Sequence, residues 1–254
     1  MPTALALSPH LDDAAFSCGG TLELLAAKGW RVVMATVFTA SVPDPQGFAL
    51  ACQLDKGLSA DVDYMALRRS EDVRAAEHLG IAPPVHLPFR EAPHRGYGSA
   101  PELFGTPRDD DRVAAELGPA LAALIRETAP DLLLAPQAIG GHVDHVRVVE
   151  ALRGLGLPLP VLWWRDFPYT VRTAEPKQPL APLFAGLPEI ALPLDSGGAE
   201  AKLRACAAYA SQIGFQFGGP AGLEARLEQE EGRERFRLTG ALPPALAALR
   251  DRAG

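Results

Sequence analysis

Short apolar runs alternate with longer amphipathic stretches through the first two thirds of the chain. The runs have the apolar, β-branched content of buried strands and lie at 3–7, 31–38, 85–89, 132–135 and 160–164. The intervening stretches repeat apolar residues with helical spacing, at 14–28, 64–79, 109–128 and 144–155. Parallel strands need crossover connections of this kind. The alternation therefore predicts an α/β fold, with an open, mostly parallel sheet of about five strands covered by helices on both faces.

The length of 254 residues, of which 48% are hydrophobic, is within the range of one large domain. We expect residues 1–254 to form a single domain, whose less regular last third (about 165–254) caps the same core and contains a helix around 199–211. Two stretches rich in Pro, Gly and polar residues, 40–59 and 90–108, are too long for ordinary connections. We expect them to form the walls of a cleft.

The net charge of -7 and the lack of a long Lys/Arg run argue against nucleic acid as a partner, because phosphate binding requires clustered cations. No basic segment precedes the first apolar run, which Ser8 and Pro9 interrupt, so we expect neither a signal peptide nor a membrane-spanning helix. These features predict a cytoplasmic protein without membrane partners, and no motif specifies an oligomeric state. The odd number and wide spacing of the cysteines favour reduced, packed thiols at Cys18, Cys52 and Cys206.

Two short polar motifs directly follow two of the predicted strands. The motif PHLDD (9–13) comes after the first strand, and HVDH (142–145) follows the strand at 132–135. Within each motif, an i, i+3 spacing places two polar side chains on one tight turn or one first helical turn. Sites in open α/β sheets lie beyond the carboxyl ends of the strands, so we expect both motifs to reach one crevice. There they offer imidazoles and carboxylates to a single divalent metal ion.

This set of residues is typical of metal-assisted hydrolysis. Imidazole and carboxylate suit Zn²⁺, and three protein ligands leave a fourth position for water, as in catalytic zinc sites. The metal brings the pKa of that water towards about 7, so a nearby carboxylate can take its proton. We assign this base role to Asp12, and the role of acid or electrophile to His142 with Asp144 as its orienting partner. Fe²⁺ or another divalent ion is an alternative to zinc, because availability decides between such metals.

Each motif by itself also has a purely structural explanation. An Asp-Asp pair before a helix commonly caps that helix, and a lone HxDH is equally compatible with a solvated surface. The occurrence of both motifs after buried strands favours the metal site. The other histidines, His78, His86 and His94, have no partner at ligand spacing, and we expect packed or solvated roles for them. His94 lies in an expected cleft wall and is also a candidate for a substrate contact.

The sequences LALSPHLDDAAFSCGG (5–20) and GGHVDH (140–145) resemble the PIG-L/LmbE family of zinc-dependent de-N-acetylases, which act on N-acetylglucosaminyl compounds. Segments at 67–81, 163–170 and 202–213 are similar to the family as well, so the resemblance extends over most of the chain. It implies a Rossmann-like three-layer α/β/α sandwich. It also implies a set of site residues, namely the zinc ligands His10, Asp13 and His145, the base Asp12, and the acid or electrophile His142 modulated by Asp144.

The chain departs from the commoner family motifs at a few positions. Leu11 and Ala14 replace the Pro and Glu of the form HPDDE, and Val143 replaces the Pro of HPDH. Some members carry a Tyr two residues before the first His of the second motif, where this chain has Gly140. An Arg near the start of the corresponding helix contacts substrate in relatives, and Arg68 or Arg69 matches it in the helix expected at 64–79. The alternative for either residue is a solvated cation on the face of that helix.

The leading hypothesis is a zinc-dependent hydrolase that removes an N-acetyl group from an N-acetylglucosamine-type amino-sugar derivative. One alternative is a zinc amidase that acts on a larger acyl group or on a non-sugar amide. A second alternative, from another class, is a catalytically inert module that binds a sugar or a nucleotide. The sequence gives this module little support, because it contains no GxGxxG after a strand and no GxxxxGK[ST]. It also has no GxSxG elbow of a serine hydrolase.

Overall fold

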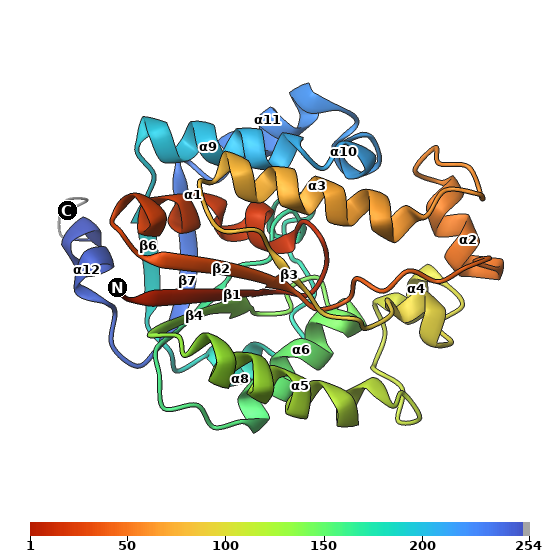
Figure 1. Ribbon diagram of the computed structural model, residues 1–254, viewed down its shortest axis with the longest axis horizontal. Coiled ribbons are helices and arrows are strands. Elements are labelled where there is room, and N and C mark those ends of the chain that lie inside the picture. Colours follow the sequence, from red (N-terminus) through yellow and green to blue (C-terminus); the bar gives the residue numbers. More distant parts are fainter. Residues whose placement is uncertain (251–254) are drawn as a thin grey trace.

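A seven-stranded sheet runs through the centre of the protein in the order β3-β2-β1-β4-β5-β7-β6 (Figure 1), in a computed structural model that describes residues 1–250. In chain order the strands are β1 (Thr3–Ser8), β2 (Arg31–Thr36), β3 (Val85–His86), β4 (Leu132–Pro136), β5 (Val161–Trp164), β6 (Glu189–Pro193) and β7 (Arg233–Thr239). Strands β1 to β5 are parallel to one another, and β7 runs antiparallel to both β5 and β6. The α/β class, with a mostly parallel sheet, is confirmed.

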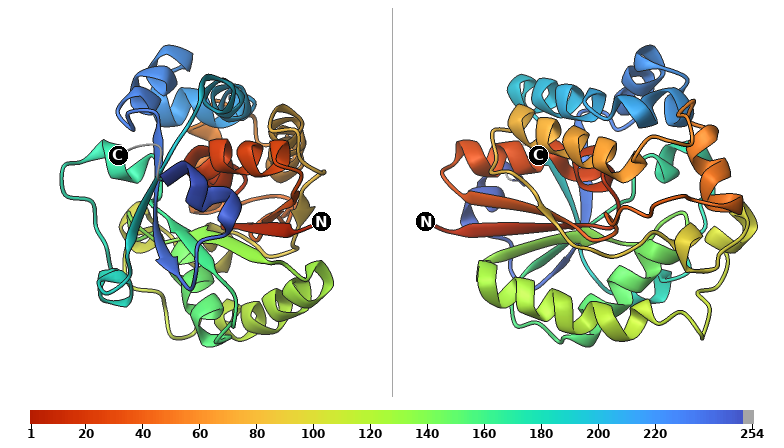
Figure 2. Two further views of the ribbon diagram at one scale, coloured as in Figure 1. Left: turned by 90° about the vertical axis from the view of Figure 1, so that its left-hand side faces the viewer. Right: turned by 45° about the vertical axis from the view of Figure 1, so that its right-hand side comes forward.

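Helices cover both faces of the sheet and produce three layers (Figures 1 and 2). One face carries α1 (Asp13–Ala27), α3 (Tyr64–His78), α9 (Ser196–Ala207), α10 (Ala210–Phe217) and α11 (Pro220–Glu228). The other face carries α5 (Val113–Thr128), α6 (Val143–Gly154) and α8 (Ala181–Phe184). The remaining elements are α2 (Gly47–Leu54), η1 (Ala92–Arg95), α4 (Ala100–Leu103), α7 (Tyr169–Arg172) and α12 (Pro244–Arg250). No helix within residues 1–250 is long and apolar enough to cross a lipid bilayer.

The central strands are buried on both faces, which explains why they read as continuous apolar runs rather than alternating ones. In β1, Ala4 and Ala6 belong to the hydrophobic core beneath α1 and α3, whereas Leu5 and Leu7 belong to the core beneath α5 and α6. All four side chains are fully buried. Alternate side chains of one strand therefore hold both helical layers in place.

The neighbouring strands β1 and β4 bring the two polar motifs together. Leu5 of β1 pairs with Leu133 of β4 in parallel register, so both strands end at the same edge of the sheet. The chain leaves β1 on one side, through β2 and β3, and leaves β4 on the other, through β5. Such a reversal of strand order opens a crevice beyond the carboxyl ends of the strands, where open α/β sheets bind their ligands.

The structure changes several expectations about individual elements. The last third supplies strands β6 and β7 in addition to helices, so the sheet has seven strands rather than about five. The helix expected around 199–211 is two helices, α9 and α10, separated at Tyr209. The stretches expected as loops contain α2 in one case and η1 with α4 in the other. That the whole chain forms a single domain stays a prediction, and the continuous sheet from β3 to β6 supports it.

Candidate active site

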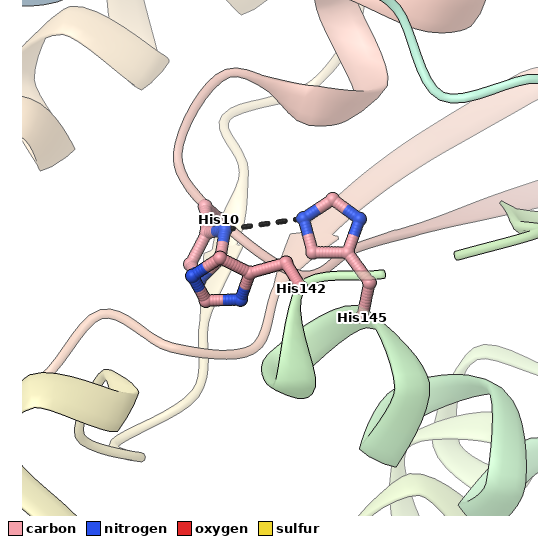
Figure 3. Close-up of side chains that lie close together, drawn as sticks. All are labelled: His10, His142 and His145. Carbon is pink, nitrogen blue, oxygen red and sulfur yellow. Dashed lines mark hydrogen bonds between the residues drawn. The ribbon is translucent and has the colours of Figure 1, made fainter. Parts of the chain in front are cut away.

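Two turns at the carboxyl ends of β1 and β4 carry the polar motifs. His10 lies in the turn after β1, and Asp13 is the first residue of α1. His142 is the N-cap residue of α6, and His145 lies in the first turn of that helix. Figure 3 shows that the three imidazoles point toward one another from the two turns. The expectation that both motifs reach one crevice is therefore met by the structure.

One atom each of His10, Asp13 and His145 forms a small triangle. The distances are 3.4 Å between His10 Nδ1 and Asp13 Oδ2, 3.1 Å between His145 Nε2 and Asp13 Oδ2, and 3.3 Å between His145 Nε2 and His10 Nδ1. Two ligands bound to one tetrahedral zinc ion at its usual bond lengths lie roughly 3.4 Å apart. A wider group, His10, His142 and His145, has its nitrogens within 4.8 Å. The tighter triangle fits the metal better, and its residues are those implied by the family resemblance.

A buried carboxylate lies behind each of the two triangle histidines. Asp144 Oδ2 is 2.9 Å from His10 Nε2, and Asp166 Oδ1 is 2.8 Å from His145 Nδ1. With a proton held on that outer nitrogen, the inner nitrogen of each ring keeps a lone pair directed into the triangle. Carboxylates in this position orient metal-binding histidines and increase their basicity. The donor set and its outer partners thus fit a divalent metal ion.

The charges within the triangle are strongly coupled. Burial lowers the pKa of His10, but the Asp13 and Asp144 carboxylates outweigh burial and raise that pKa to about 9. Burial raises the pKa of Asp13, but His145 and His10 outweigh it and hold the pKa well below its usual range. The protein's own groups therefore favour carboxylate and imidazolium here. A metal ion replaces such protons, so its binding is expected to release protons and to weaken at low pH.

Asp12 lies beside the triangle and does not cap α1. It occupies the N-cap position, but its side chain makes no capping hydrogen bond, which removes the structural explanation for this residue. Burial raises the pKa of Asp12 to about 7, despite the opposing effect of the Arg68 guanidinium. Arg68 Nη2 lies 3.6 Å from Oδ1, and Gln216 Nε2 donates a hydrogen bond to Oδ2 at 2.9 Å.

His142 is held in one neutral tautomer. The backbone N–H of Asp144 donates to His142 Nδ1 at 3.2 Å, so the ring proton of neutral His142 is on Nε2. Burial and the neighbouring His10 lower the pKa of His142 to about 3. The Phe104 ring packs edge-on against it, with ring centroids 5.3 Å apart. A neutral N–H at this place can donate a hydrogen bond to a developing oxyanion, which favours the electrophile role over the acid role.

Asp144 has different partners from those expected. Its carboxylate accepts hydrogen bonds from His10 Nε2, from the Ala92 backbone N–H at 3.1 Å and from Arg95 Nη2 at 2.7 Å. It comes no closer than 4.0 Å to His142 Nδ1. The group that orients His142 is therefore the backbone N–H of Asp144, and not the Asp144 side chain as predicted. The Asp144 carboxylate instead orients His10 and holds η1 against the site.

A cavity of about 340 Å³ opens onto these side chains. The stretches expected to form a cleft supply part of its walls, with Phe48 and Cys52 on α2 and with Glu91, His94 and Phe104 from 90–108. This confirms their placement beside the site. A pocket of this size suits a small molecule of one or two rings.

The structure separates the two candidate arginines. Arg68 lines the cavity, and its guanidinium donates to Glu91 Oε1 at 2.5 Å and to the Leu11 carbonyl at 3.0 Å. Arg69 instead donates to Thr39 and Ser41, and it is not among the cavity residues. Of the two, only Arg68 is placed to contact a substrate.

The remaining histidines and the cysteines lie outside the triangle. His86 Nε2 is 2.8 Å from Asp72 Oδ2, His78 is exposed, and His94 lines the cavity. The three cysteines, Cys18, Cys52 and Cys206, are all free, as expected. The first and last are buried, whereas Cys52 lines the cavity wall.

Four site residues lie outside the two polar motifs, and two of them, Asp166 and Tyr169, belong to the segment 163–170 that resembles the family. Asp166, Arg95, Gln216 and Tyr169 come from segments whose positions only the fold brings together. Tyr169 also explains the departure at Gly140. A Cβ atom at position 140 would lie 2.5 Å from the Tyr169 ring, and Gly140 has a φ of 95°, which side-chain-bearing residues rarely adopt. The tyrosine ring thus fills the space that a side chain at 140 would need.

The fold and the site together define a class of protein, a three-layer α/β protein with a cluster of His and Asp side chains that fits a metal ion at the topological switch point of its sheet. Sequence comparison identifies the family. Residues 5–155 match the PIG-L family, described as GlcNAc-PI de-N-acetylase. The chain belongs to this family and is a de-N-acetylase, a hydrolase that acts on an amide C–N bond. The family resemblance and the enzyme class predicted from the sequence are confirmed.

Two relatives share a more specific description. A 2'-N-acetylparomamine deacetylase of Streptomyces fradiae is 37% identical over 214 residues, which cover 82% of this chain and 72% of that protein. A 2'-N-acetylparomamine deacetylase of Niallia circulans is 32% identical over 184 residues, which cover 64% of this chain and 66% of that protein.

Solved structures with similar folds are also deacetylases. A deacetylase of the teicoplanin biosynthesis pathway, in complex with bog, has a TM-score of 0.81 and 26% identity, covering 94% of this chain and 98% of that one. The zinc-inhibited form of a teicoplanin deacetylase has a TM-score of 0.79 and 25% identity with the same coverage. The fold of this chain is therefore that of known deacetylases along almost its whole length.

Proposed function

We propose that this protein is a zinc-dependent deacetylase that removes the acetyl group from a 2-acetamido sugar within a small amino-sugar derivative. The observation that carries the proposal is the triangle of His10 Nδ1, Asp13 Oδ2 and His145 Nε2, of which His10 and Asp13 line the cavity. The relatives that act on 2'-N-acetylparomamine support the substrate class. The cavity of about 340 Å³ is large enough for a substrate of one or two rings.

The triangle residues would hold the ion, and zinc bound there would supply Lewis acidity and lower the pKa of water at its open position. Asp12 is the base. Because Gln216 donates to Oδ2, Oδ1 is the oxygen free to accept a proton from the attacking water. His142 donates its Nε2 hydrogen to the carbonyl oxygen of the acetamide as negative charge develops there. The proton held on Asp12 then passes to the departing nitrogen, so the products are acetate and the free amine.

The binding of substrate involves the cavity walls. We infer that Arg68, 4% exposed and lining the cavity, contributes a substrate contact together with its partner Glu91. The pocket is rimmed by several aromatic rings, and aromatic faces pack well against the apolar faces of sugars. The expected cytoplasmic location, and the expected lack of nucleic-acid and membrane partners, stay predictions.

The test is product analysis with metal-defined enzyme. The purified chain is loaded with zinc, its metal content is measured, and a panel of N-acetylglucosamine conjugates including 2'-N-acetylparomamine is offered. We expect acetate and free amine in equal amounts from at least one conjugate. Zinc bound at one ion per chain without acetate release from any conjugate would overturn the proposal.

Two added arms separate the alternatives. A series of acyl chains on one sugar distinguishes a deacetylase from an amidase for larger acyl groups. Equilibrium binding of a conjugate without turnover, unaffected by Asp12→Ala, would favour the inert binding module. Reconstitution with Fe²⁺ instead of zinc tests the identity of the metal separately from the identity of the substrate.

A further inference from the structure

Gln216 on α10 hydrogen-bonds the carboxylate that we assign as the base. Its Nε2 donates to Asp12 Oδ2 at 2.9 Å, although the two residues are 204 positions apart in the chain. Gln216 is half-buried and lines the cavity. Helix α10 therefore contributes a polar side chain to the catalytic centre.

The orientation of the Gln216 amide is fixed by a second contact. Arg172 Nη2 donates to Gln216 Oε1 at 3.2 Å. A guanidinium can only donate, so the amide oxygen must face Arg172 and the NH₂ group must face Asp12. The Arg172 guanidinium also lies over the Tyr169 ring, 5.3 Å from its centroid. Arg172, Gln216 and Asp12 thus form a chain of contacts with one consistent direction of donation.

The helix that carries Gln216 is held firmly on α3. The backbone N–H and the hydroxyl of Ser211 donate to the buried Glu71 carboxylate at 2.8 and 2.7 Å. Gln212 Nε2 donates to the Tyr64 hydroxyl at 3.0 Å. The same helix α3 carries Arg68. Both groups that approach Asp12, one at each oxygen, are therefore held by one packed pair of helices.

Asp12 needs such support because its own turn provides none. The side chain makes no capping hydrogen bond, and Arg68 stays 3.6 Å from Oδ1. We propose that Gln216 is a positioning residue that fixes Asp12 Oδ2, so that Oδ1 faces the attacking water and takes its proton. This inference rests on the function proposed above. A base that is held in the correct geometry increases the rate of proton transfer by a large factor, and a freely rotating carboxylate loses much of this advantage.

The test is the variant Gln216→Leu, which removes the amide and leaves a slightly shorter, apolar side chain. We expect kcat for acetate release to fall about 10- to 100-fold, the range for a lost hydrogen bond to a charged group. The KM and the zinc content should stay as in the wild type. Gln216→Glu should lose at least as much, because its carboxylate repels Asp12.

Gln229→Leu is the matched control. It makes the same change at the end of the neighbouring helix α11, where the Gln229 amide bonds the Ala225 carbonyl outside the cavity. It should keep the kcat of the wild type. A double variant gives the sharpest discrimination, because Gln216→Leu should have no further effect on the residual rate of Asp12→Asn if it acts only through Asp12.

The outcomes separate this inference from the function on which it rests. If Asp12→Asn is inactive but Gln216→Leu keeps the kcat of the wild type, the positioning role alone is wrong. A loss of kcat in Gln216→Leu that is matched by loss of zinc or by a lower melting temperature would also overturn it. If Asp12→Asn keeps full activity, the proposed base is wrong and the positioning role is wrong with it.

Discussion

Replacement of Asp166 by Asn tests whether the carboxylate that hydrogen-bonds the outer nitrogen of His145 sets the metal affinity of the site. Asp166 Oδ1 bonds His145 Nδ1 at 2.8 Å, and Oδ2 accepts from the backbone N–H groups of Gln137 at 3.1 Å and Ile139 at 2.9 Å. An Asn at 166 can keep its oxygen on these two N–H groups while its NH₂ group faces His145. The Asn NH₂ group and the His145 Nδ1–H would then both be donors facing each other. The conflict is relieved if the His145 ring proton moves from Nδ1 to Nε2, but Nε2 is the atom that belongs to the triangle.

The expected effect is a loss of metal affinity with little loss of structure. Changes to such outer partners typically cost 10- to 100-fold in metal affinity, or about 1.4–2.8 kcal/mol. The measurement is zinc Kd at fixed pH, by competition with a chromophoric chelator. The control is Asp195→Asn, which removes the same charge at the N-cap of α9, where Asn caps as well as Asp and the zinc Kd should not change.

The reasoning would be refuted by a folded Asp166→Asn protein whose zinc Kd equals that of the wild type. In that case the carboxylate behind His145 would not set its tautomer. A weaker zinc affinity in the Asp195→Asn control as well would show that loss of negative charge in general, rather than this hydrogen bond, decides the affinity.

Four further predictions concern rate and stability. Asp12→Asn should keep zinc but lower the rate of acetate release about 10²- to 10⁴-fold, and metal loss in this variant would contradict the base role. Gly140→Ala should lower the free energy of unfolding by about 1–3 kcal/mol in a denaturant titration, because it combines a positive φ with the clash against Tyr169, and an unchanged midpoint would refute this. Lys202→Met should cost about 3–5 kcal/mol, because it leaves the buried Glu234 carboxylate without its partner at 2.8 Å. Burial lowers the pKa of Lys202, but Glu234 outweighs burial and raises that pKa. In the wild type this pair should therefore stabilise the fold below the usual lysine range and lose its effect as pH rises above the raised pKa, which alkaline unfolding curves measure.

Local patterns in the sequence were sufficient for the class of fold and for the convergence of the two polar motifs. Short β-branched runs such as RVVMATVF favour central strands of a covered sheet, and helices between them favour parallel crossovers. The motifs containing His10 and His145 follow such strands directly. Strand ends in a parallel sheet share one edge, so the convergence of these motifs follows from chain order alone.

The strands β6 and β7 were beyond sequence reasoning because they lie at the antiparallel end of the sheet. In β7, buried Glu234, Phe236 and Leu238 alternate with partly exposed residues. The buried glutamate breaks the expected apolar pattern, and only the fold supplies Lys202 and the N–H groups of α1 that compensate its charge. A buried charge with distant partners has no signature in a local window of sequence.

The partners of the ligands were decided by tertiary structure for the same reason. The sequence placed Asp144 beside His142 because the two are close in the chain, but the first turn of α6 directs that carboxylate to His10 on another element. Asp166 and Gln216 reach the site only because β5 and α10 end there. Hydrogen bonds select partners by distance and direction in space, so a sequence specifies which ligands are present, and the packed fold specifies what holds them.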